Sequence, residues 1–331
     1  MKRILSLFML AVVCLGYAII ANFNRKETIV IYTSTEDYNM ELLNEKLKEE
    51  FPSYNIEIVY HSTSTVASRI IEEGEFSEAD IAYQIEYGYL EKMKEANVLA
   101  NIKEMYDYTV YVDDVVAEPF RDYILPGIRN GGAVIINNTV LQQNGIPKPT
   151  CFEDLLDSKF LNKVSMPSPK SSGTGYMFLL ALINAWGEEK AFEYFDKLEP
   201  NILAFESSGS GPVNKLTMNE VAVGFGMTAQ AVNKINDGRN DIEVLFFDEG
   251  SPCSLYGSSI VKGKETKSSV VNVFKYIAEH YNEIACSNFY PEKIFKDKTF
   301  KVDNFPEEIT YSNMENNTLD RKNYILNKWK Y

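Results

Sequence analysis

The sequence predicts an α/β protein of two lobes, each with a mostly parallel sheet and helices on both faces. The first observation is length: the chain has 331 residues, and a domain usually spans roughly 100–200 residues, so two lobes are expected. The second is a regular alternation of short apolar segments with segments whose apolar residues recur every three or four positions. That alternation is typical of β-α-β units, in which helices connect parallel strands.

The first block of this pattern lies between residues 28 and 95. Its three predicted strands are the segments 28–32, 56–60 and 79–83. The helix between the first two strands has Met40, Leu43, Leu47 and Phe51 on one face. Further apolar residues mark the next two helices: Val66, Ile70, Ile71, Leu90 and Met93.

A second block repeats the alternation. Its predicted strands are the segments 133–136, 163–166, 202–205, 221–226, 242–247 and 258–261. Its predicted helices are the segments 175–186, 188–198, 228–235 and 268–281. From about residue 294 the chain is polar and poorly patterned, and we expect it to wrap the surface.

Composition excludes several classes of function. Lys and Arg number 33 against 47 Asp and Glu, which gives a formal net charge of −14. A chain this acidic is a poor candidate for binding the phosphate backbone of nucleic acids. The two histidines, His61 and His280, are too few for a multi-histidine metal site. The four cysteines form no CxxC motif, and we expect no cofactor.

The N-terminus predicts export. Lys2 and Arg3 precede an apolar run over residues 4–21, which is the pattern of a secretion signal. The run is also long enough to remain as a membrane anchor, since a spanning helix needs about 20 residues. A third interpretation is lipidation of Cys14, although Val13 stands where a small residue is expected. All three interpretations place the chain from about residue 27 onward outside the cytoplasm.

Four turns rich in Ser and Thr each follow a predicted strand and precede a helix. In open α/β sheets, ligands bind at that edge. Helix N-termini have N–H groups without intrahelical partners, and glycine lets a ligand approach the backbone closely. Such turns can therefore hold a phosphate, phosphonate or sulfate without Lys or Arg. The candidate ligand-binding residues are Ser34, Thr35, Ser62, Thr63, Ser171, Ser172, Gly173, Thr174, Gly175, Tyr176, Ser208, Gly209 and Ser210.

Each turn also has a simpler interpretation, because Ser and Thr are preferred helix N-caps, worth about 1 kcal/mol each. The turn SSGTGY, residues 171–176, is the strongest candidate, since one cap does not need two hydroxyls and two glycines. The negative net charge does not exclude an anionic ligand, because charges beyond about 8–10 Å are screened.

Motifs of common enzymes are absent. The chain has no G-x-S-x-G turn, and the dipeptide Gly263-Lys264 is followed by Glu265 where a P-loop needs Ser or Thr. His61 and Ser62 are adjacent, a spacing that rarely lets the two side chains face each other. The sequence therefore predicts a binding protein and not an enzyme. A disulfide between Cys151 and Cys253 remains an open alternative to free thiols.

The order of these motifs resembles the bacterial extracellular solute-binding proteins, family 1. The shared motifs include V-Y-x-S-T, A-D-I-A-Y, P-x-x-F-E-D-L-L, M-P-x-P-x-S-S-G-T-G-Y, S-G-S-G-P and E-V-A-V-G-F-G, between about residues 28 and 281. The resemblance is greatest to ABC-importer components that bind ferric iron, 2-aminoethylphosphonate or sugar phosphates. It implies a type II periplasmic-binding fold, in which two lobes close on a ligand held in the cleft between them.

The resemblance also implies a division of the chain. Residues 27–128 and 259–331 would form the first lobe and residues 137–250 the second. The hinge would consist of the crossings 129–136 and 251–258. Residues 1–26 would be the signal peptide or anchor.

Specificity is less well defined by the resemblance. Ferric-binding members have a consecutive Tyr pair after the strand that matches residues 221–226. Here that place reads Met227-Thr228-Ala229-Gln230, so tyrosinate iron binding is not favoured and remains the alternative. Sugar-phosphate members have His-Asp at Ala229-Gln230 and keep a Glu at Glu249. Gln230 and Glu249 are therefore candidates to contact the rest of the ligand. Arg129 is a further candidate to face the cleft.

We therefore expect an exported, monomeric solute-binding protein that captures a small phosphorylated or phosphonate compound for an ABC permease. The second interpretation is an extracytoplasmic sensor, held in the membrane by residues 4–21, that reports the same ligand to a sensor kinase.

Overall fold

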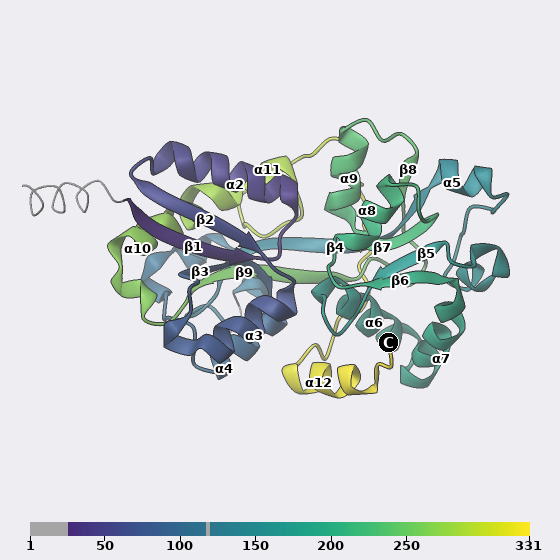
Figure 1. Ribbon diagram of the computed structural model, residues 1–331, viewed down its shortest axis with the longest axis horizontal. Coiled ribbons are helices and arrows are strands. Elements are labelled where there is room, and N and C mark those ends of the chain that lie inside the picture. Colours follow the sequence, from purple (N-terminus) through teal and green to yellow (C-terminus); the bar gives the residue numbers. More distant parts are fainter. Residues whose placement is uncertain (1–25, 117–119) are drawn as a thin grey trace, which may run out of the picture.

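The computed structural model describes residues 26–116 and 120–331 (Figure 1). The candidate export segment, including Lys2, Arg3 and Cys14, lies outside these residues. In the described part of the chain, no helix is both long enough and apolar enough to cross a bilayer. The strands described form one sheet in the order β2-β1-β3-β9-β4-β7-β5-β6, with β8 paired to β4. The predicted α/β class is confirmed.

The first lobe is built on three parallel strands, β1 (Glu27–Thr33), β2 (Tyr54–Tyr60) and β3 (Ile81–Glu86). Helices α2 (Asp37–Glu50), α3 (Thr63–Glu73) and α4 (Tyr87–Glu95) connect or follow them. Figure 1 shows α2 on one side of the strands, with α3 and α4 on the other. Ile29 and Ile31 of β1 share a core with Leu43 and Leu47 of α2, because the spacing of these residues puts them on facing surfaces.

The second lobe has a second parallel set, in which β5 (Val164–Pro167) lies between β6 (Ile202–Glu206) and β7 (Val223–Met227). Its helices are α5 (Asn138–Gln143), α6 (Gly173–Trp186), α7 (Glu188–Leu198), α8 (Gly211–Thr217) and α9 (Thr228–Asn236). Every residue of α6 from Gly173 to Ile183 is buried. Such a helix is held by packing all round, so its N-terminus has a defined position.

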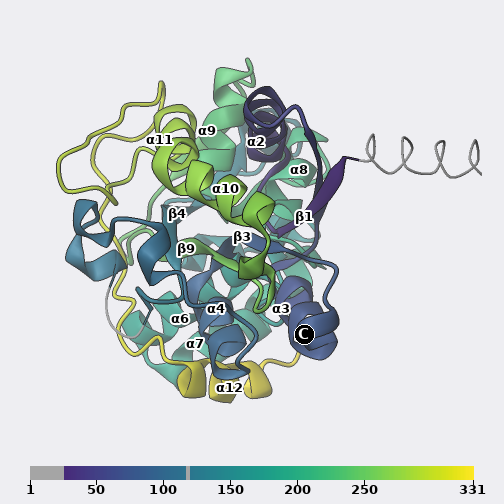
Figure 2. The same ribbon diagram turned by 90° about the vertical axis from the view of Figure 1, so that its left-hand side faces the viewer.

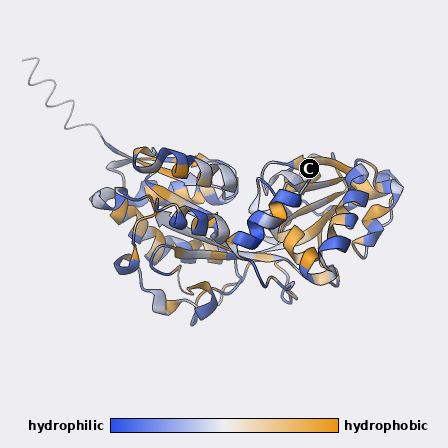
Figure 3. Ribbon diagram, turned by 90° about the horizontal axis from the view of Figure 1, so that it is seen from below, coloured by the Kyte–Doolittle hydropathy of each residue, from blue (hydrophilic) through white to orange (hydrophobic). Residues whose placement is uncertain are grey.

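Two long strands join the lobes, β4 (Leu125–Asn137) and β9 (Cys253–Ile260). The first half of β4 pairs antiparallel with β9, and its second half pairs antiparallel with β7 and β8 (Ile242–Leu245). β9 also pairs antiparallel with β3. The sheet is thus parallel within each lobe and antiparallel where the chain crosses, because the crossing strands run in opposite directions. Figure 3 shows the narrow connection between the lobes.

The C-terminal segment departs from the expected assignment of residues 259–331 to the first lobe. Helices α10 (Ser268–Tyr276) and α11 (Asn282–Asn288), with the π-helical turn Ile277–Tyr281 between them, lie on that lobe. The chain then descends to α12 (Leu319–Lys328) (Figure 2). Trp329 after α12 packs on the second lobe, with ring centroids 5.1 Å from Phe195 and 5.7 Å from Phe205. Burial of this terminal aromatic side chain holds the C-terminus against the second lobe, so residues 259–331 belong to both lobes.

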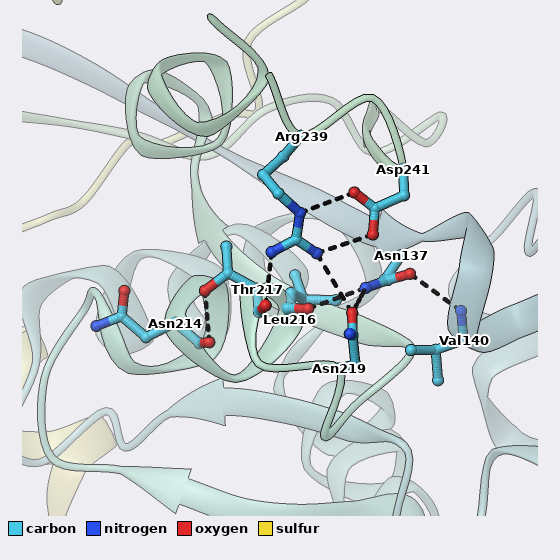
Figure 4. A network of polar contacts seen from close by, with 8 residues as sticks. All are labelled: Asn137, Val140, Asn214, Leu216, Thr217, Asn219, Arg239 and Asp241. Carbon is cyan, nitrogen blue, oxygen red and sulfur yellow. Dashed lines mark hydrogen bonds and ion pairs between the residues drawn. The ribbon is translucent and has the colours of Figure 1, made fainter. Parts of the chain in front are cut away.

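A polar network anchors α8 to the second lobe (Figure 4). Asn137 Nδ2, at the end of β4, donates hydrogen bonds to Leu216 O at 2.9 Å and to Asn219 Oδ1 at 2.8 Å. Arg239 binds Asp241 through two bonds of 2.8 Å and also reaches Asn219 Oδ1 at 3.3 Å. The network fixes the end of α8, a helix that begins at the serine-rich turn 207–211.

Candidate functional site

Serine-rich turns from both lobes meet around a small cavity of about 30 Å³. The first lobe and the joining strands contribute Ser34, Thr35, Glu36, Thr63, Gln84, Ile128, Asn130 and Tyr256. The second lobe contributes Ser172, Thr174, Gly209 and Ser210. A cavity of this size has room for only a water molecule or two, and Ser64 Oγ of the first lobe donates a hydrogen bond to Ser171 O of the second, so the lobes are closed on each other.

The N-terminus of α6 forms one wall. Ser172 is the N-cap residue, and its Oγ accepts a hydrogen bond from the Gly175 N–H at 3.4 Å. Both Ser172 and Thr174 are almost fully buried and line the cavity. A Cβ on Gly175 would lie 2.4 Å from the carbonyl oxygen of Pro167, so only glycine lets α6 start this close to the end of β5. Ser172 is therefore a helix cap and a cavity residue at once.

The turn before α8 lies directly beside the start of α6. A Cβ on Gly209 would be only 2.4 Å from Thr174 Oγ1, which shows how closely the two turns approach. Ser208 Oγ and Ser210 Oγ are 3.2 Å apart. Gln230 Nε2 donates to the carbonyl oxygen of Ser210 at 3.2 Å. Gln230 thus positions the turn and does not itself line the cavity.

Hydrogen bonds hold the first-lobe hydroxyls in place. Thr35 Oγ1 donates to Gln84 Oε1 at 3.1 Å, and Asn39 Nδ2 donates to both Thr35 Oγ1 and Gln84 Oε1 at 2.9 Å. Thr63 Oγ1 donates to Ser34 Oγ at 3.1 Å. Ser34 Oγ in turn donates to the backbone carbonyl oxygen of Gln84 at 3.3 Å, which connects the two groups, so the hydroxyls of this wall are preorganised.

Glu36 is the acidic residue of the cavity wall. It occupies the N-cap position of α2, but its side chain makes no capping hydrogen bond. Its Oε2 accepts a hydrogen bond from Tyr290 OH at 3.0 Å and lies 3.4 Å from Thr35 Oγ1. Burial raises the pKa of Glu36, against the opposing effect of these hydrogen bonds and of its own backbone N–H.

Two buried amide atoms on the cavity wall have no hydrogen-bond partner among the residues the structure describes. They are Gln84 Nε2, a donor, and Asn130 Oδ1, an acceptor. The two side chains are 1% and 2% exposed. Buried polar atoms are normally paired, so these two remain available to polar groups of a molecule in the cavity.

The structure brings seven of the candidate residues to the cavity: Ser34, Thr35, Thr63, Ser172, Thr174, Gly209 and Ser210. Two others lie in contacts close by. The carbonyl oxygen of Ser171 accepts a hydrogen bond from Ser64 Oγ at 3.0 Å, which is a contact between the lobes. Ser62 Oγ lies 2.8 Å from Thr65 Oγ1.

The remaining candidates are engaged elsewhere. Glu249 Oε1 accepts a hydrogen bond from Trp186 Nε1 at 2.9 Å, so this carboxylate is held by α6 outside the cavity wall. Arg129 forms an ion pair with Asp114. Tyr176 is buried and does not line the cavity, and its ring centroid lies 4.5 Å from Lys322 Nζ. Gly173, Gly175 and Ser208 shape the turns without lining the cavity.

Five cavity residues were not among those predicted from the sequence: Glu36, Gln84, Ile128, Asn130 and Tyr256. Glu36 follows Thr35 directly, and an acid in the first polar turn after a strand is a signal that could have identified it. Gln84 has a positive φ of 47° at an irregularity in β3, and that conformation depends on strand pairing. Asn130, Ile128 and Tyr256 lie within crossing strands, where no local signal distinguishes them.

The described residues contain neither a cluster that could bind a metal ion nor a disulfide. No group of three or more His, Cys, Asp or Glu side chains in residues 26–116 and 120–331 is placed to hold a metal ion. Cys151, Cys253 and Cys286 are free thiols. The Cys151–Cys253 disulfide left open by the sequence is therefore not formed.

With the fold and cavity described, comparison with known proteins decides the family. Residues 73–322 match the family described as bacterial extracellular solute-binding protein. The chain belongs to this family. The resemblance stated from the motifs is thereby confirmed, and with it the expectation of a binding protein and not an enzyme.

Similar proteins agree with this assignment. An uncharacterized protein of Haemophilus influenzae is 26% identical over 264 residues, 76% of this chain and 73% of that protein. The periplasmic binding protein AfuA from Actinobacillus pleuropneumoniae, solved with fructose-6-phosphate, has a TM-score of 0.79 at 21% identity, covering 92% of this chain and 98% of that one. The periplasmic binding protein P5PA has a TM-score of 0.78 at 19% identity, with the same coverages. These structural likenesses confirm the two-lobed periplasmic-binding fold.

Proposed function

We propose that this solute-binding protein captures a small phosphorylated or phosphonate compound between its lobes and presents it to an ABC permease. The observation that carries the proposal is the meeting of Ser172 and Thr174, at the N-terminus of α6, with Ser210 from the neighbouring turn around one cavity. A helix N-terminus with adjacent hydroxyls is suited to anion oxygens.

The donors of the cavity support an anionic ligand. Within the described chain no Lys or Arg lines the cavity, so the anion would be held by neutral donors. Gln84 Nε2 adds an amide donor that is buried and has no partner in the described chain. The relative AfuA, whose structure contains fructose-6-phosphate, belongs to the same fold and fits this ligand class.

Binding requires motion of the lobes. With the lobes closed the cavity has room for little more than water, so the lobes would have to separate for a phosphate compound to enter. The crossings through β4 and β9 are the natural hinge for this motion. Contacts between lobes, such as Ser64 Oγ to Ser171 O, would break on opening.

Calorimetry on the purified full chain tests the proposal. The probes are hexose phosphates, phosphonates, inorganic phosphate, sulfate, ferric citrate and thiamine. The double variant Ser172→Ala/Thr174→Ala should weaken binding of the phosphorylated or phosphonate probe more than tenfold. The matched control is Ser62→Ala/Thr65→Ala, which also removes two hydroxyls but none from the cavity wall. Binding of ferric citrate alone, or equal losses in both double variants, would contradict the proposal.

The partner and location follow from the same proposal. A closed, loaded protein would dock as a monomer on an ABC permease at the extracytoplasmic face of the membrane. Comparing residues 1–331 with a chain that lacks residues 1–25 in membrane fractionation tests whether the N-terminus keeps the protein there.

A further inference from the structure

Helix α12 is attached to both lobes, and its C-terminal end is attached to the second. Trp329, directly after the helix, packs on Phe195 of α7 and Phe205 of β6. Lys328, in the last turn of α12, forms an ion pair with Glu188, the first residue of α7. Two kinds of contact, one apolar and one ionic, therefore hold this end of the helix on the second lobe.

The other end of α12 inserts a lysine between the lobes. Lys322 Nζ donates a hydrogen bond of 2.7 Å to Glu86 Oε2 at the end of β3, and it lies 3.9 Å from the ring centroid of Tyr89 in α4. On its other side the ring centroid of Tyr176, in the second lobe, is 4.5 Å away. A Cβ on Gly88 would lie 3.0 Å from Nζ, so the absence of a side chain there leaves the ammonium group its space.

The pair lies next to the candidate binding site. Glu86 follows the cavity residue Gln84 by two positions. A Cβ on Gly173, between the cavity residues Ser172 and Thr174, would be 3.1 Å from Glu86 Cβ. The N-terminus of α6 therefore meets the first lobe at Glu86, and separation of the lobes would move α6 and α12 away from this carboxylate.

The environment of the pair favours the closed arrangement. A buried ion pair stabilises a structure only where further contacts satisfy its charged groups. Here Ser254 Oγ donates to the second carboxylate oxygen of Glu86 at 3.1 Å, and two aromatic rings face the ammonium group. Such cation–π contacts are strongest when they are shielded from water, and Lys322 is only 3% exposed.

One end of α12 must release when the lobes separate. Release of Trp329 would expose a large apolar surface to water, with nothing in return. Release of Lys322 from Glu86 lets water hydrate both charged groups, which offsets much of the lost attraction. The ion pair is therefore the end that opens, while Trp329 keeps α12 on the second lobe.

We propose that α12 is a latch, in which the Lys322–Glu86 pair holds the lobes together in the unloaded protein and releases when they open. The proposal goes beyond the proposed function, because it holds for any solute that enters the cleft. The latch would set the fraction of unloaded protein that is closed. The apparent affinity for a ligand of the closed form scales with that fraction.

Small-angle X-ray scattering of the full chain without added solute tests the latch. The double variant Glu86→Gln/Lys322→Met removes the pair and leaves no unpaired charge. Its radius of gyration should exceed that of the wild type, because more of the protein is open. The matched control is Glu49→Gln/Lys46→Met, which removes an ion pair within α2 and should leave the radius of gyration unchanged. Circular dichroism verifies that each variant is folded.

Trp329→Ala tests the latch from its other end. It keeps the Lys322–Glu86 pair but frees α12 from the second lobe, so the radius of gyration should again rise. If the double variant does not fold, this variant decides alone. A folded double variant with the wild-type radius of gyration would overturn the proposal. So would a wild-type value in Trp329→Ala, or an equal rise in the control.

Discussion

Lys322 Nζ donates a hydrogen bond of 2.7 Å to Glu86 Oε2, and both side chains are at most 3% exposed. The pair joins α12 near the C-terminus to the end of β3. Ser254 Oγ donates to the other carboxylate oxygen at 3.1 Å. Lys322 Nζ also lies 3.9 Å from the ring centroid of Tyr89 in the first lobe and 4.5 Å from that of Tyr176 in the second. One ammonium group thus contacts both lobes.

Removing one partner of this pair should be strongly destabilising. Lys322→Met leaves Glu86 buried without its counter-charge, which costs about 3–5 kcal/mol. Adding Glu86→Gln to the same chain should recover much of the loss, because no unpaired charge then remains. Urea denaturation of the single and double variants measures both effects. A single variant as stable as the wild type would show that the charge of Glu86 is compensated in another way.

The glycine at position 175 should not tolerate a side chain. In Gly175→Ala the new Cβ would lie 2.4 Å from Pro167 O and 2.7 Å from the backbone carbon of Ser168. Because backbone atoms must move, we expect a loss of about 1–3 kcal/mol in the free energy of unfolding, with weaker ligand binding. Lys170→Ala, an exposed change in the same turn, is the control and should be near neutral. Equal stability of the two variants would contradict the close approach.

Glu292 should make stability depend on pH. Burial raises its pKa to about 7, although hydrogen bonds from Tyr311 OH and from the Gly131 N–H, and the nearby Arg129, act in the opposite direction. The folded protein therefore holds a proton on Glu292 that the unfolded chain releases near pH 4.5. The raised pKa of Glu292 therefore contributes roughly 3 kcal/mol to the free energy of unfolding below pH 4.5. This stabilisation is lost as the pH rises to about 7.

The Glu292→Gln variant isolates this effect. Its free energy of unfolding should fall less than that of the wild type between pH 4.5 and 7, by roughly the same 3 kcal/mol. Urea denaturation at several pH values gives the free energy of unfolding of each protein as a function of pH. Parallel curves for the two proteins would show that Glu292 keeps an ordinary pKa.

The terminal aromatic contact should hold α12 on the second lobe. Trp329 is 2% exposed and packs on Phe195 and Phe205. Trp329→Ala removes a large buried side chain, and such changes cost about 3–5 kcal/mol. Tyr324→Ala, within α12, is the control, since Tyr324 is 46% exposed and its replacement should cost little stability. Limited proteolysis near residue 318 should be faster in Trp329→Ala only.

Local sequence patterns determined the class of fold and the position of the turns. Ile29 and Ile31 alternate, which predicts a strand, and Leu43 and Leu47 recur at helical spacing, which predicts a helix. Both predictions need only residues close together in the chain. The turn at Ser172–Gly175 was recognisable because its hydroxyls and glycines are consecutive. Such features depend on residues within a few positions of one another, which is what a sequence displays.

The composition of the cavity was decided by tertiary structure. Gln84 and Asn130 are ordinary polar residues inside strands, and only the pairing of β3, β4 and β9 brings them to the cavity. Glu249, expected in the cleft, is instead bound by Trp186, and Gln230 is bound to the Ser210 carbonyl. A polar side chain forms its hydrogen bonds with the groups that packing places next to it, and here those groups belong to residues far away in the chain. Sequence therefore located the edge of the sheet that forms the site, and the packing of two lobes selected the side chains that face it.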